Sequence, residues 1–313
     1  METFNQDPNF SIVMQGGCNA ECEFCFNKQQ GKKKQCPKID YIINLWETLR
    51  VLPSQFYQIS ITGNEPMLSP MLDDVMAICA KLKTRYTNIL LTTNGTNLIE
   101  KAKTVIDGVH HINVSRHHYD YEENKKIFRG SWDVTDEDME TIIDLYGSHG
   151  IDVSLNCVIN DNTTEDFINK YIDYAKRIGA FAVRFRKENG TLDMTPVENV
   201  FADKYKIIWH GTCPVCRTDL RLIRGLKTYW KSSVLEPSDT IKDKVFELVY
   251  ATDGNVYLDW ANKKRYKVGA EYDPVKNFIN TLNGVANKPK FDTLYSICSC
   301  GGSNSCGGNF SRC

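Results

Sequence analysis

Gly16-Gly17-Cys18-Asn19-Ala20-Glu21-Cys22-Glu23-Phe24-Cys25-Phe26-Asn27 places three cysteines within eight residues. The C-x3-C-x2-C spacing supplies three thiolates and no fourth close ligand. Clusters of the 4Fe-4S type are usually held by four cysteines, so three thiolates on one loop would leave one iron open. An open position is typical of a reactive metal site, whereas structural sites are closed. The run therefore predicts a reactive metal centre.

Two other uses of these cysteines are weaker. Disulfides persist mainly in oxidising compartments, and we see no signal-peptide pattern at the start of the sequence. Zinc sites usually combine paired C-x2-C or Cys/His spacings. No such partner follows closely on Cys25.

The run resembles the cluster-binding loop of radical S-adenosylmethionine (radical SAM) enzymes, including the aromatic Phe24 directly before the last cysteine. The resemblance implies that Cys18, Cys22 and Cys25 hold a 4Fe-4S cluster and that S-adenosylmethionine (AdoMet) chelates the fourth iron. The reduced cluster would then cleave AdoMet to methionine and a 5′-deoxyadenosyl radical. The resemblance also implies that Phe24 stacks near the adenine and that a flavodoxin or ferredoxin type of donor supplies the electron.

The composition narrows the class of protein. With 42% hydrophobic residues in 313, the chain can bury a sizeable core. Thirty-eight basic residues against 39 acidic ones give no global attraction to nucleic acid or to a membrane surface. No apolar run approaches the ~20 residues that span a bilayer. Twelve cysteines without an export signal indicate a reducing, cytoplasmic location and metal binding.

From residue 9 to 186, short β-rich runs alternate with helical stretches, which is the pattern of βαβ units and a parallel sheet. We expect strands at 9–15, 56–62, 88–93, 110–115, 151–159 and 180–186. We expect helices at 38–52, 71–84, 163–179 and, after a long loop, near 135–148. Six such units predict an α/β protein with a partial (β/α)6 TIM-like barrel over residues 1–190. Its active site would lie at the carboxyl ends of the strands, where the cysteine run begins.

Side chains alternate between the two faces of each strand, so an apolar set under the helices leaves a polar set facing inward. The inward set is Gln58, Ser60, Thr62, Thr92, Asn94, His111, Asn113, Ser115, Ser154, Asn156, Arg184 and Arg186. A polar interior suits an open barrel that holds a ligand, because closed barrels fill their interior with aliphatic side chains. A solvent-facing sheet surface is the alternative. Cys79 and Cys157 fall among apolar residues and are expected to be buried packing residues.

The turn Thr62-Gly63-Asn64-Glu65-Pro66 resembles the Gly-Gly-Glu-Pro segment of the radical SAM family. In that family its backbone and glutamate receive the AdoMet amino group, which makes Gly63, Asn64 and Glu65 candidate cofactor-binding residues. Asn64 replaces the second glycine, and asparagine tolerates left-handed backbone angles better than most residues do. An ordinary turn between strand and helix is the alternative.

The end of the fourth strand gathers polar residues. The resemblance implies that Ser115 contacts the AdoMet ribose or carboxylate, and Arg116 suits a carboxylate by its fork geometry. We expect the catalytic candidates to lie over the barrel mouth, where they could exchange protons or hydrogen atoms with a substrate: His117, His118, Tyr119 and Asp120. A solvated loop is the alternative.

Two further strands add cofactor candidates. Asn156 on the fifth strand lies at the level where family members bind the ribose, and Arg184 on the sixth is a second partner for the AdoMet carboxylate. The additional charge of Arg186 would then suggest an anionic substrate. Salt bridges to Glu188 or Glu65 are the competing explanation.

Six cysteines follow the barrel, within residues 191–313: Cys213, Cys216, Cys298, Cys300, Cys306 and Cys313. A β-hairpin is predicted over 246–260, turning at Asp253-Gly254. The layout resembles radical SAM members with a SPASM or twitch domain, which implies an auxiliary 4Fe-4S cluster, with zinc as the alternative metal. Those hairpins usually carry a cysteine where this chain has Asp259 and Trp260, so the ligand order is not transferred. A flexible tail with incidental cysteines is the remaining alternative.

Together these features predict a radical SAM enzyme that abstracts a hydrogen atom from its substrate. The C-terminal cysteines favour a peptide or protein substrate. A small anionic metabolite or nucleotide is the second possibility, supported by Arg184, Arg186 and the histidine-rich loop. A non-enzymatic iron–sulfur or zinc module is the third, and it would leave the polar interior unexplained.

Overall fold

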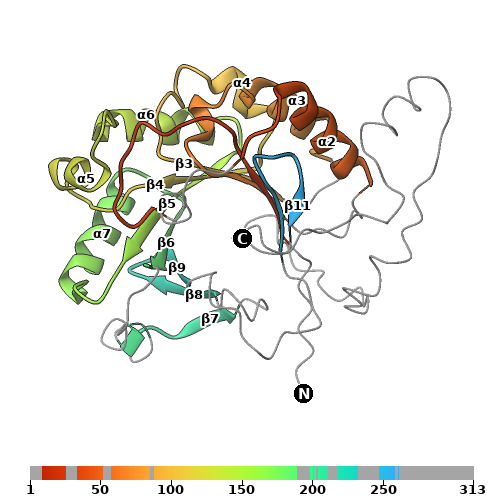
Figure 1. The fold of residues 1–313 in the computed structure, drawn as a ribbon. Coiled ribbons are helices and arrows are strands. Elements are labelled where there is room, and N and C mark those ends of the chain that lie inside the picture. Colours follow the sequence, from red (N-terminus) through yellow and green to blue (C-terminus); the bar gives the residue numbers. More distant parts are fainter. Residues whose placement is uncertain are drawn as a thin grey trace, which may run out of the picture.

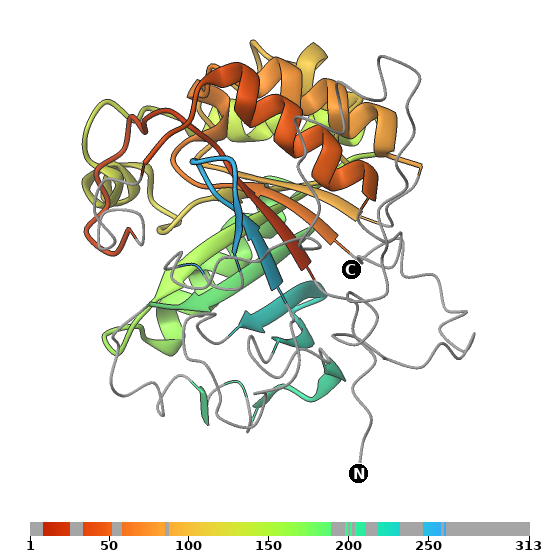
Figure 2. The same cartoon turned by 45° about the vertical axis from the view of Figure 1, so that its right-hand side comes forward.

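The computed structural model describes residues 9–25, 34–51, 58–84, 88–188, 198–199, 201, 204–210, 218–231, 247–257 and 260. These residues contain one sheet of eleven strands in the order β11-β10-β1-β2-β3-β4-β5-β6-β9-β8-β7. The sheet curves into an open barrel with helices along its convex side (Figures 1 and 2). Within the described residues, β11 and β7 form its two edges.

Six parallel strands form the centre of the sheet, in sequence order. They are β1 (Asn9–Val13), β2 (Gln58–Thr62), β3 (Asn88–Thr93), β4 (His111–Ser115), β5 (Asp152–Ile159) and β6 (Ala182–Lys187). Every predicted strand boundary lies within two residues of the observed one. The predicted partial (β/α)6 barrel is therefore confirmed as an open parallel sheet.

The four predicted helices are also present: α2 (Lys38–Val51), α3 (Leu72–Leu82), α6 (Asp136–Gly147) and α7 (Glu165–Arg177). Side-chain caps fix where two of them begin. Thr135 and Asp138 form a reciprocal capping box at α6, and the Thr164 hydroxyl accepts from Phe167 N at α7. Short elements η1 (Pro66–Leu68) and α4 (Ala102–Ile106) complete the connections after β2 and β3.

The expectation of a long loop after the fourth strand was wrong, because α5 (Tyr121–Phe128) lies there. Asp120 begins this helix, since its carboxylate accepts a hydrogen bond from Glu123 N. Glu122 and Glu123 lie in the first turn, where their negative charges interact favourably with the positive end of the helix dipole. Only Asn124 and Phe128 of α5 are buried, and four of its eight residues are charged.

Strands from the C-terminal third extend both edges of the barrel sheet. β9 (Leu226–Lys231) pairs in parallel with β6 and antiparallel with β8 (Thr218–Ile223), and β8 pairs antiparallel with β7 (Ile207–His210). The predicted hairpin is confirmed as β10 (Glu247–Tyr250) and β11 (Val256–Tyr257). β10 also pairs in parallel with β1, so the hairpin belongs to the barrel sheet (Figure 2). A domain boundary near residue 190 stays a prediction.

The two faces of the sheet separate as predicted. Ile59, Ile61 and Leu155 are buried on the helix side, as is Cys157, and Cys79 is buried within α3. On the inward side the strand register pairs polar residues, such as Asn113 with Ser154. None of the helices in the described ranges is both long and apolar enough to cross a membrane.

Candidate active site

The three cysteines of the N-terminal run follow β1 at the carboxyl edge of the sheet. Cys18, Cys22 and Cys25 form no disulfide bond; Cys18 is exposed and Cys22 is buried. Among the described residues, no three His, Cys, Asp or Glu side chains converge to hold a single metal ion. A 4Fe-4S cluster makes a different demand, because each thiolate binds its own iron. Three separate thiols on one loop fit this ligand set.

The turn after β2 holds the cysteine loop in place. Asn64 Nδ2 donates to Met14 O at 2.7 Å, and Glu65 N donates to Gly17 O at 3.0 Å. Gly63 and Asn64 have φ of +82° and +48°. A Cβ on Gly63 would lie 2.6 Å from Val13 Cγ1, so only glycine fits there. The expectation that asparagine tolerates this backbone conformation is confirmed.

The Glu65 carboxylate ties this turn to the end of β3. It accepts hydrogen bonds from Thr93 Oγ1 at 2.5 Å, Asn94 N at 2.7 Å and Met67 N at 3.0 Å. The carboxylate is 1% exposed. Burial raises its pKa to about 7, while the three hydrogen bonds act in the opposite direction. Both carboxylate oxygens are therefore already engaged within the protein.

Asn94 is the residue of β3's carboxyl end that reaches the cysteine loop. Its Nδ2 lies 3.8 Å from Cys18 Sγ and donates to Asn19 Oδ1 at 2.8 Å. Although Cys18 as a residue is exposed, desolvation of its thiol by neighbouring groups raises the thiol pKa, and the N–H groups of Ala20 and Asn94 lower it. From the sequence, Asn94 was expected on the inward face, with no role in the site. The run Thr93-Asn94-Gly95 at the carboxyl end of a strand was the available signal.

The end of α5 and the residues after it also hydrogen-bond to the cysteine loop. Glu21 N donates to Phe128 O at 2.6 Å, and Ser131 N donates to Asn19 O at 2.9 Å. Gly130 lies against this contact with φ of +63°. A Cβ there would lie 2.4 Å from the carbonyl oxygen of Asn19. The cysteine loop is thus fixed by elements that follow three different strands.

His117 lies in an aromatic stack beneath the cysteine loop. Its ring is 4.8 Å from Phe24 and 4.9 Å from Phe128, centroid to centroid. Its Nδ1 accepts from Val158 N at 3.2 Å, which assigns the proton to Nε2. Burial lowers its pKa to about 3. His117 is therefore a neutral packing ring, and this placement gives no support to its predicted role in catalysis.

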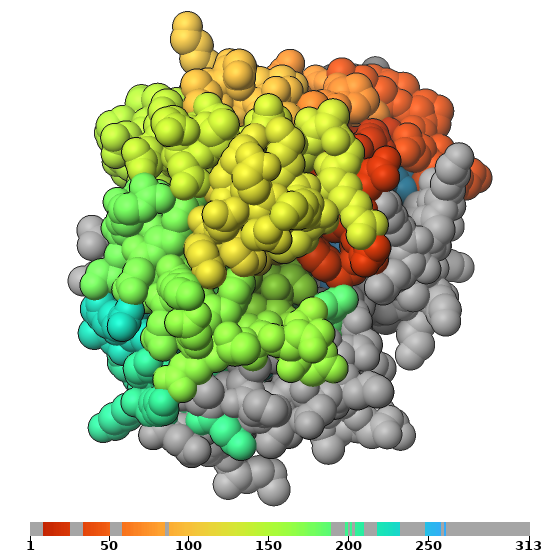
Figure 3. All heavy atoms as spheres, turned by 90° about the vertical axis from the view of Figure 1, so that its left-hand side faces the viewer, coloured from red at the N-terminus to blue at the C-terminus, as the bar shows by residue number. Residues whose placement is uncertain are grey.

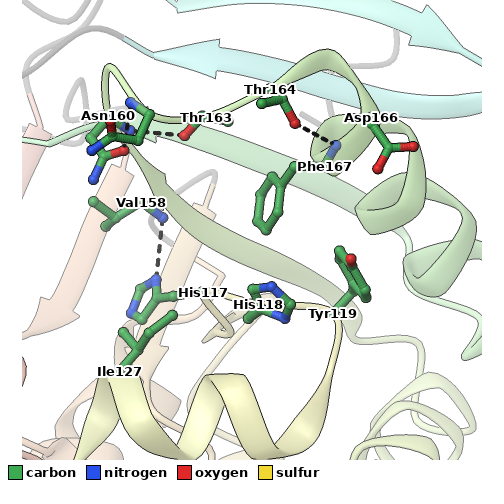
Figure 4. A pocket seen from close by; sticks show the side chains of 11 residues that line it. His117, His118, Tyr119, Ile127, Val158, Asn160, Thr163, Thr164, Asp166 and Phe167 are labelled. Atoms are coloured by element: carbon green, nitrogen blue, oxygen red, sulfur yellow. Dashed lines mark hydrogen bonds between the residues drawn. The ribbon is translucent and has the colours of Figure 1, made fainter.

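The next two residues line a cavity of about 400 Å³ between the loops after β4 and β5. The His118 ring lies 4.4 Å from Tyr119 and 5.3 Å from Phe167. Figure 4 shows His118 and Tyr119 facing Thr163 and Phe167 across this cavity. Figure 3 shows this side of the molecule, hollowed between α5 (yellow) and α7 (green) next to the cysteine loop (red). Catalytic roles for His118 and Tyr119 stay predictions.

Two residues predicted for the site serve the scaffold. The Asp120 carboxylate caps α5. The Arg116 side chain is fully buried and donates to Asp136 at 2.5 Å, to Val134 O at 3.0 Å and to His118 O at 3.2 Å. Arg116 follows the inward-facing Ser115, so alternation turns it toward the helix layer. These contacts give no support to the expected contact with AdoMet, which stays a prediction.

Three cofactor candidates form a row across neighbouring strands. Ser115 pairs in register with Asn156, and Asn156 pairs with Arg184. The Arg184 guanidinium carbon lies 4.4 Å from the centre of the Tyr229 ring on β9. The structure thus brings these residues together, and their contacts with AdoMet stay predictions. The six cysteines from Cys213 to Cys313 lie outside the described residues, as does Asp259.

An open parallel barrel with a three-thiolate loop at its carboxyl edge defines a class of enzyme that presents an iron–sulfur cluster to a ligand. Residues 12–175, just over half of the chain, match the family described as the Radical SAM superfamily. The chain belongs to the radical SAM superfamily. Membership implies a 4Fe-4S cluster and AdoMet.

Relatives that match in sequence cover part of the chain. A probable GTP 3′,8-cyclase of Methanococcus aeolicus is 28% identical over 166 residues, which are 52% of this chain and 53% of the cyclase. An S-adenosylmethionine-dependent nucleotide dehydratase of a Thermoplasmatales archaeon is 29% identical over 160 residues, 50% of this chain and 55% of that protein. The chain spans about half the length of these relatives.

A solved structure matches over more of the chain. Streptococcus suis SuiB bound to precursor peptide SuiA superimposes with a TM-score of 0.56 at 13% identity, over 93% of this chain and 67% of SuiB. At that identity the likeness shows a shared fold alone.

Proposed function

We propose that Cys18, Cys22 and Cys25 bind a 4Fe-4S cluster and that the enzyme abstracts a hydrogen atom from a substrate held over the barrel mouth. Reductive cleavage of AdoMet at the cluster would supply the 5′-deoxyadenosyl radical. The observation that carries the proposal is the direct hydrogen bonding of the cysteine loop to the turn 63–66 at the carboxyl edge of the sheet. This edge is where barrels of this type place their active sites.

Different residues around the loop would contact different parts of AdoMet. The backbone of Gly63 and Asn64 would receive the amino group, while Glu65 holds the turn through Thr93 and Asn94. Ser115 and Asn156 would meet the ribose. Arg184, in the same row, would meet the carboxylate, and Phe24 would pack near the adenine.

The proposal is tested by anaerobic reconstitution of the full chain and reduction with dithionite. We expect 5′-deoxyadenosine to form from AdoMet. Cys22→Ala should form none, because a cluster ligand is lost. Cys79→Ala is the matched control, because Cys79 is buried in α3 and its product yield should equal that of the wild type. Absence of product above the Cys22→Ala level would contradict the proposal.

A peptide or protein is one candidate substrate. It is supported by the cysteines after the barrel, which would hold an auxiliary cluster as in SPASM or twitch members. Iron analysis tests this part: about eight irons per chain indicate two clusters, and about four indicate one. With two clusters, Cys300→Ala/Cys306→Ala should lower the iron content toward four. An unchanged content would leave these cysteines without a role as ligands.

A further inference from the structure

The pairing of β9 with β6 places four cations on one inward-facing patch of the sheet. Arg184 and Arg186 alternate along β6, and Lys227 and Lys231 lie at the two ends of β9. The register sets Arg186 beside Lys231 and Arg184 beside Tyr229. Neighbouring strands are about 4.8 Å apart, so Arg186 lies close to Lys231, whereas Lys227 lies about 13 Å further along β9. We call Arg184, Arg186, Lys227 and Lys231 the cationic patch.

The intervening residues show which way the patch faces. Val183 and Phe185 on β6 are buried, as is Trp230, which pairs with Phe185. Phe185 packs on Tyr171 of α7, and Trp230 packs on Phe201. Because alternate side chains point to opposite faces, the four cations point away from the helix layer and into the barrel.

Two of the cations make cation–π contacts with aromatic rings. Arg184 lies over Tyr229, and Lys227 Nζ lies 4.3 Å from the centre of the Phe181 ring. The positive charge extends into the barrel, since burial and then the charges of Arg184 and Lys227 lower the pKa of His111 to about 3. The charges of Arg184 and Lys227 therefore reach the side chains inside the barrel.

On the opposite wall, the inward residues of β1 and β2 carry no charge. On β1 and β2 the inward residues Asn9, Gln58 and Ser60 hydrogen-bond to one another. Among the described inward residues of β5, β6 and β9, Asp152 is the one carboxylate. Positive charge is thus concentrated on the β6–β9 side.

We propose that the cationic patch binds the phosphate groups of a phosphorylated small-molecule substrate. The proposal rests on the proposed function and adds the substrate class. Arginine forks bind phosphate oxygens in pairs, and lysines contribute compact charges beside them. Several cations within one patch match a chain of phosphates better than the single carboxylate of a peptide side chain. Arg186 and Lys231 lie toward the carboxyl edge, so phosphates there would leave the rest of the substrate near the cysteine loop.

The test measures binding of inorganic triphosphate to the reconstituted full chain by calorimetry. Wild-type protein should bind it, and the affinity should fall as ionic strength rises. Arg186→Gln/Lys231→Gln should bind at least about tenfold more weakly, because two of the charge-assisted contacts are lost. Lys103→Gln/Lys126→Gln is the matched control, since it removes two exposed charges from helices outside the barrel and should not change the affinity.

A charge-conserving variant separates binding from misfolding. Arg186→Lys/Lys231→Arg should retain most of the affinity, and circular dichroism should show the same fold for every variant. Failure of the wild type to bind triphosphate would overturn the proposal, as would equal affinity in Arg186→Gln/Lys231→Gln. Tighter binding of hexaglutamate than of triphosphate would also overturn it, in favour of an acidic peptide. The binding assay does not use AdoMet cleavage, so normal 5′-deoxyadenosine formation without triphosphate binding would overturn the phosphate assignment alone.

Discussion

Asn94 Nδ2 lies 3.8 Å from Cys18 Sγ, at the point where the end of β3 meets the cysteine loop. Two further hydrogen bonds hold the Asn94 amide in this direction. Its Nδ2 also donates to Asn19 Oδ1, and its own Oδ1 accepts from Thr96 N at 3.0 Å. The backbone of Asn94 is fixed by Glu65 and by the Trp132 indole. Its N–H group is therefore positioned to donate to the sulfur of a cluster ligand.

Asn94→Ala should lower the reduction potential of the cluster. Hydrogen bonds to sulfur stabilise the reduced form, which carries more negative charge. A loss of about 1 kcal/mol corresponds to roughly 40 mV for one electron. The measurement is a potentiometric titration of the reconstituted protein followed by electron paramagnetic resonance. Asn88→Ala at the opposite end of β3 is the control and should keep the wild-type potential. An Asn94→Ala potential equal to wild type would show that the contact does not tune the cluster.

Gly130→Ala should impair assembly of the cluster. The new Cβ would lie 2.4 Å from Asn19 O, and φ of +63° is unfavourable for alanine. Relief of the clash would displace either α5 or the cysteine loop. We expect fewer irons per chain after reconstitution and a loss of stability of about 2 kcal/mol.

The control for this substitution is Gly147→Ala, where nothing lies within 4 Å of the added Cβ. It should bind as much iron as the wild type. Equal iron content in Gly130→Ala and Gly147→Ala would mean that the contact between the cysteine loop and the segment 128–131 is not needed to form the site.

The elements with strong periodicity could be predicted from the sequence because their apolar side chains repeat at the spacing of a strand or helix. The pairing of β9 with β6 and of β10 with β1 could not. A parallel pair between distant segments leaves no local pattern, so the cationic patch was only half visible as Arg184 and Arg186. α5 was missed because it is short and half of its residues are charged, although Asp120 followed by Glu122 and Glu123 is a helix-start signal.

Arg116 shows how a motif can override a simpler rule. Alternation along β4 places Ser115 inward and therefore Arg116 outward, where the structure has it. The fork geometry of arginine favoured the AdoMet carboxylate instead. Glu65 differs, because only the structure shows that its carboxylate is satisfied by Thr93, Asn94 and Met67.

Asp136→Asn should destabilise the protein without changing AdoMet affinity. Arg116 is fully buried, and Asp136 supplies its carboxylate partner. Its loss should cost about 2 kcal/mol, since a buried charge is left without its ion pair. Urea unfolding measures this change, and equilibrium binding of AdoMet should stay within about twofold of wild type.

Asp133→Asn provides the comparison, because Asp133 pairs with Lys125 on the surface and exposed pairs contribute little. It should unfold like the wild type. If Asp136→Asn kept wild-type stability and bound AdoMet more weakly, Arg116 would be a cofactor ligand after all.

His117→Phe should make stability less sensitive to acid. The pKa of His117 is lowered to about 3 in the folded protein, from an ordinary value near 6.5. Below pH 6.5 the unfolded chain therefore binds a proton that the folded chain does not, and the unfolding free energy falls as the pH falls. Between pH 7.5 and 5 the protonation of this one group should lower the free energy of unfolding by about 2 kcal/mol.

Phenylalanine retains the ring between Phe24 and Phe128 and has no proton to bind. The free energy of unfolding in urea, measured at both pH values, should therefore drop by about 2 kcal/mol less in His117→Phe than in the wild type. The lost acceptor for Val158 N lowers stability equally at both pH values, so the comparison uses the difference between them. His149→Phe, at an exposed histidine, should keep the wild-type difference. The same drop in His117→Phe and the wild type would show that the ring is protonated in the folded protein and so remains available for proton transfer.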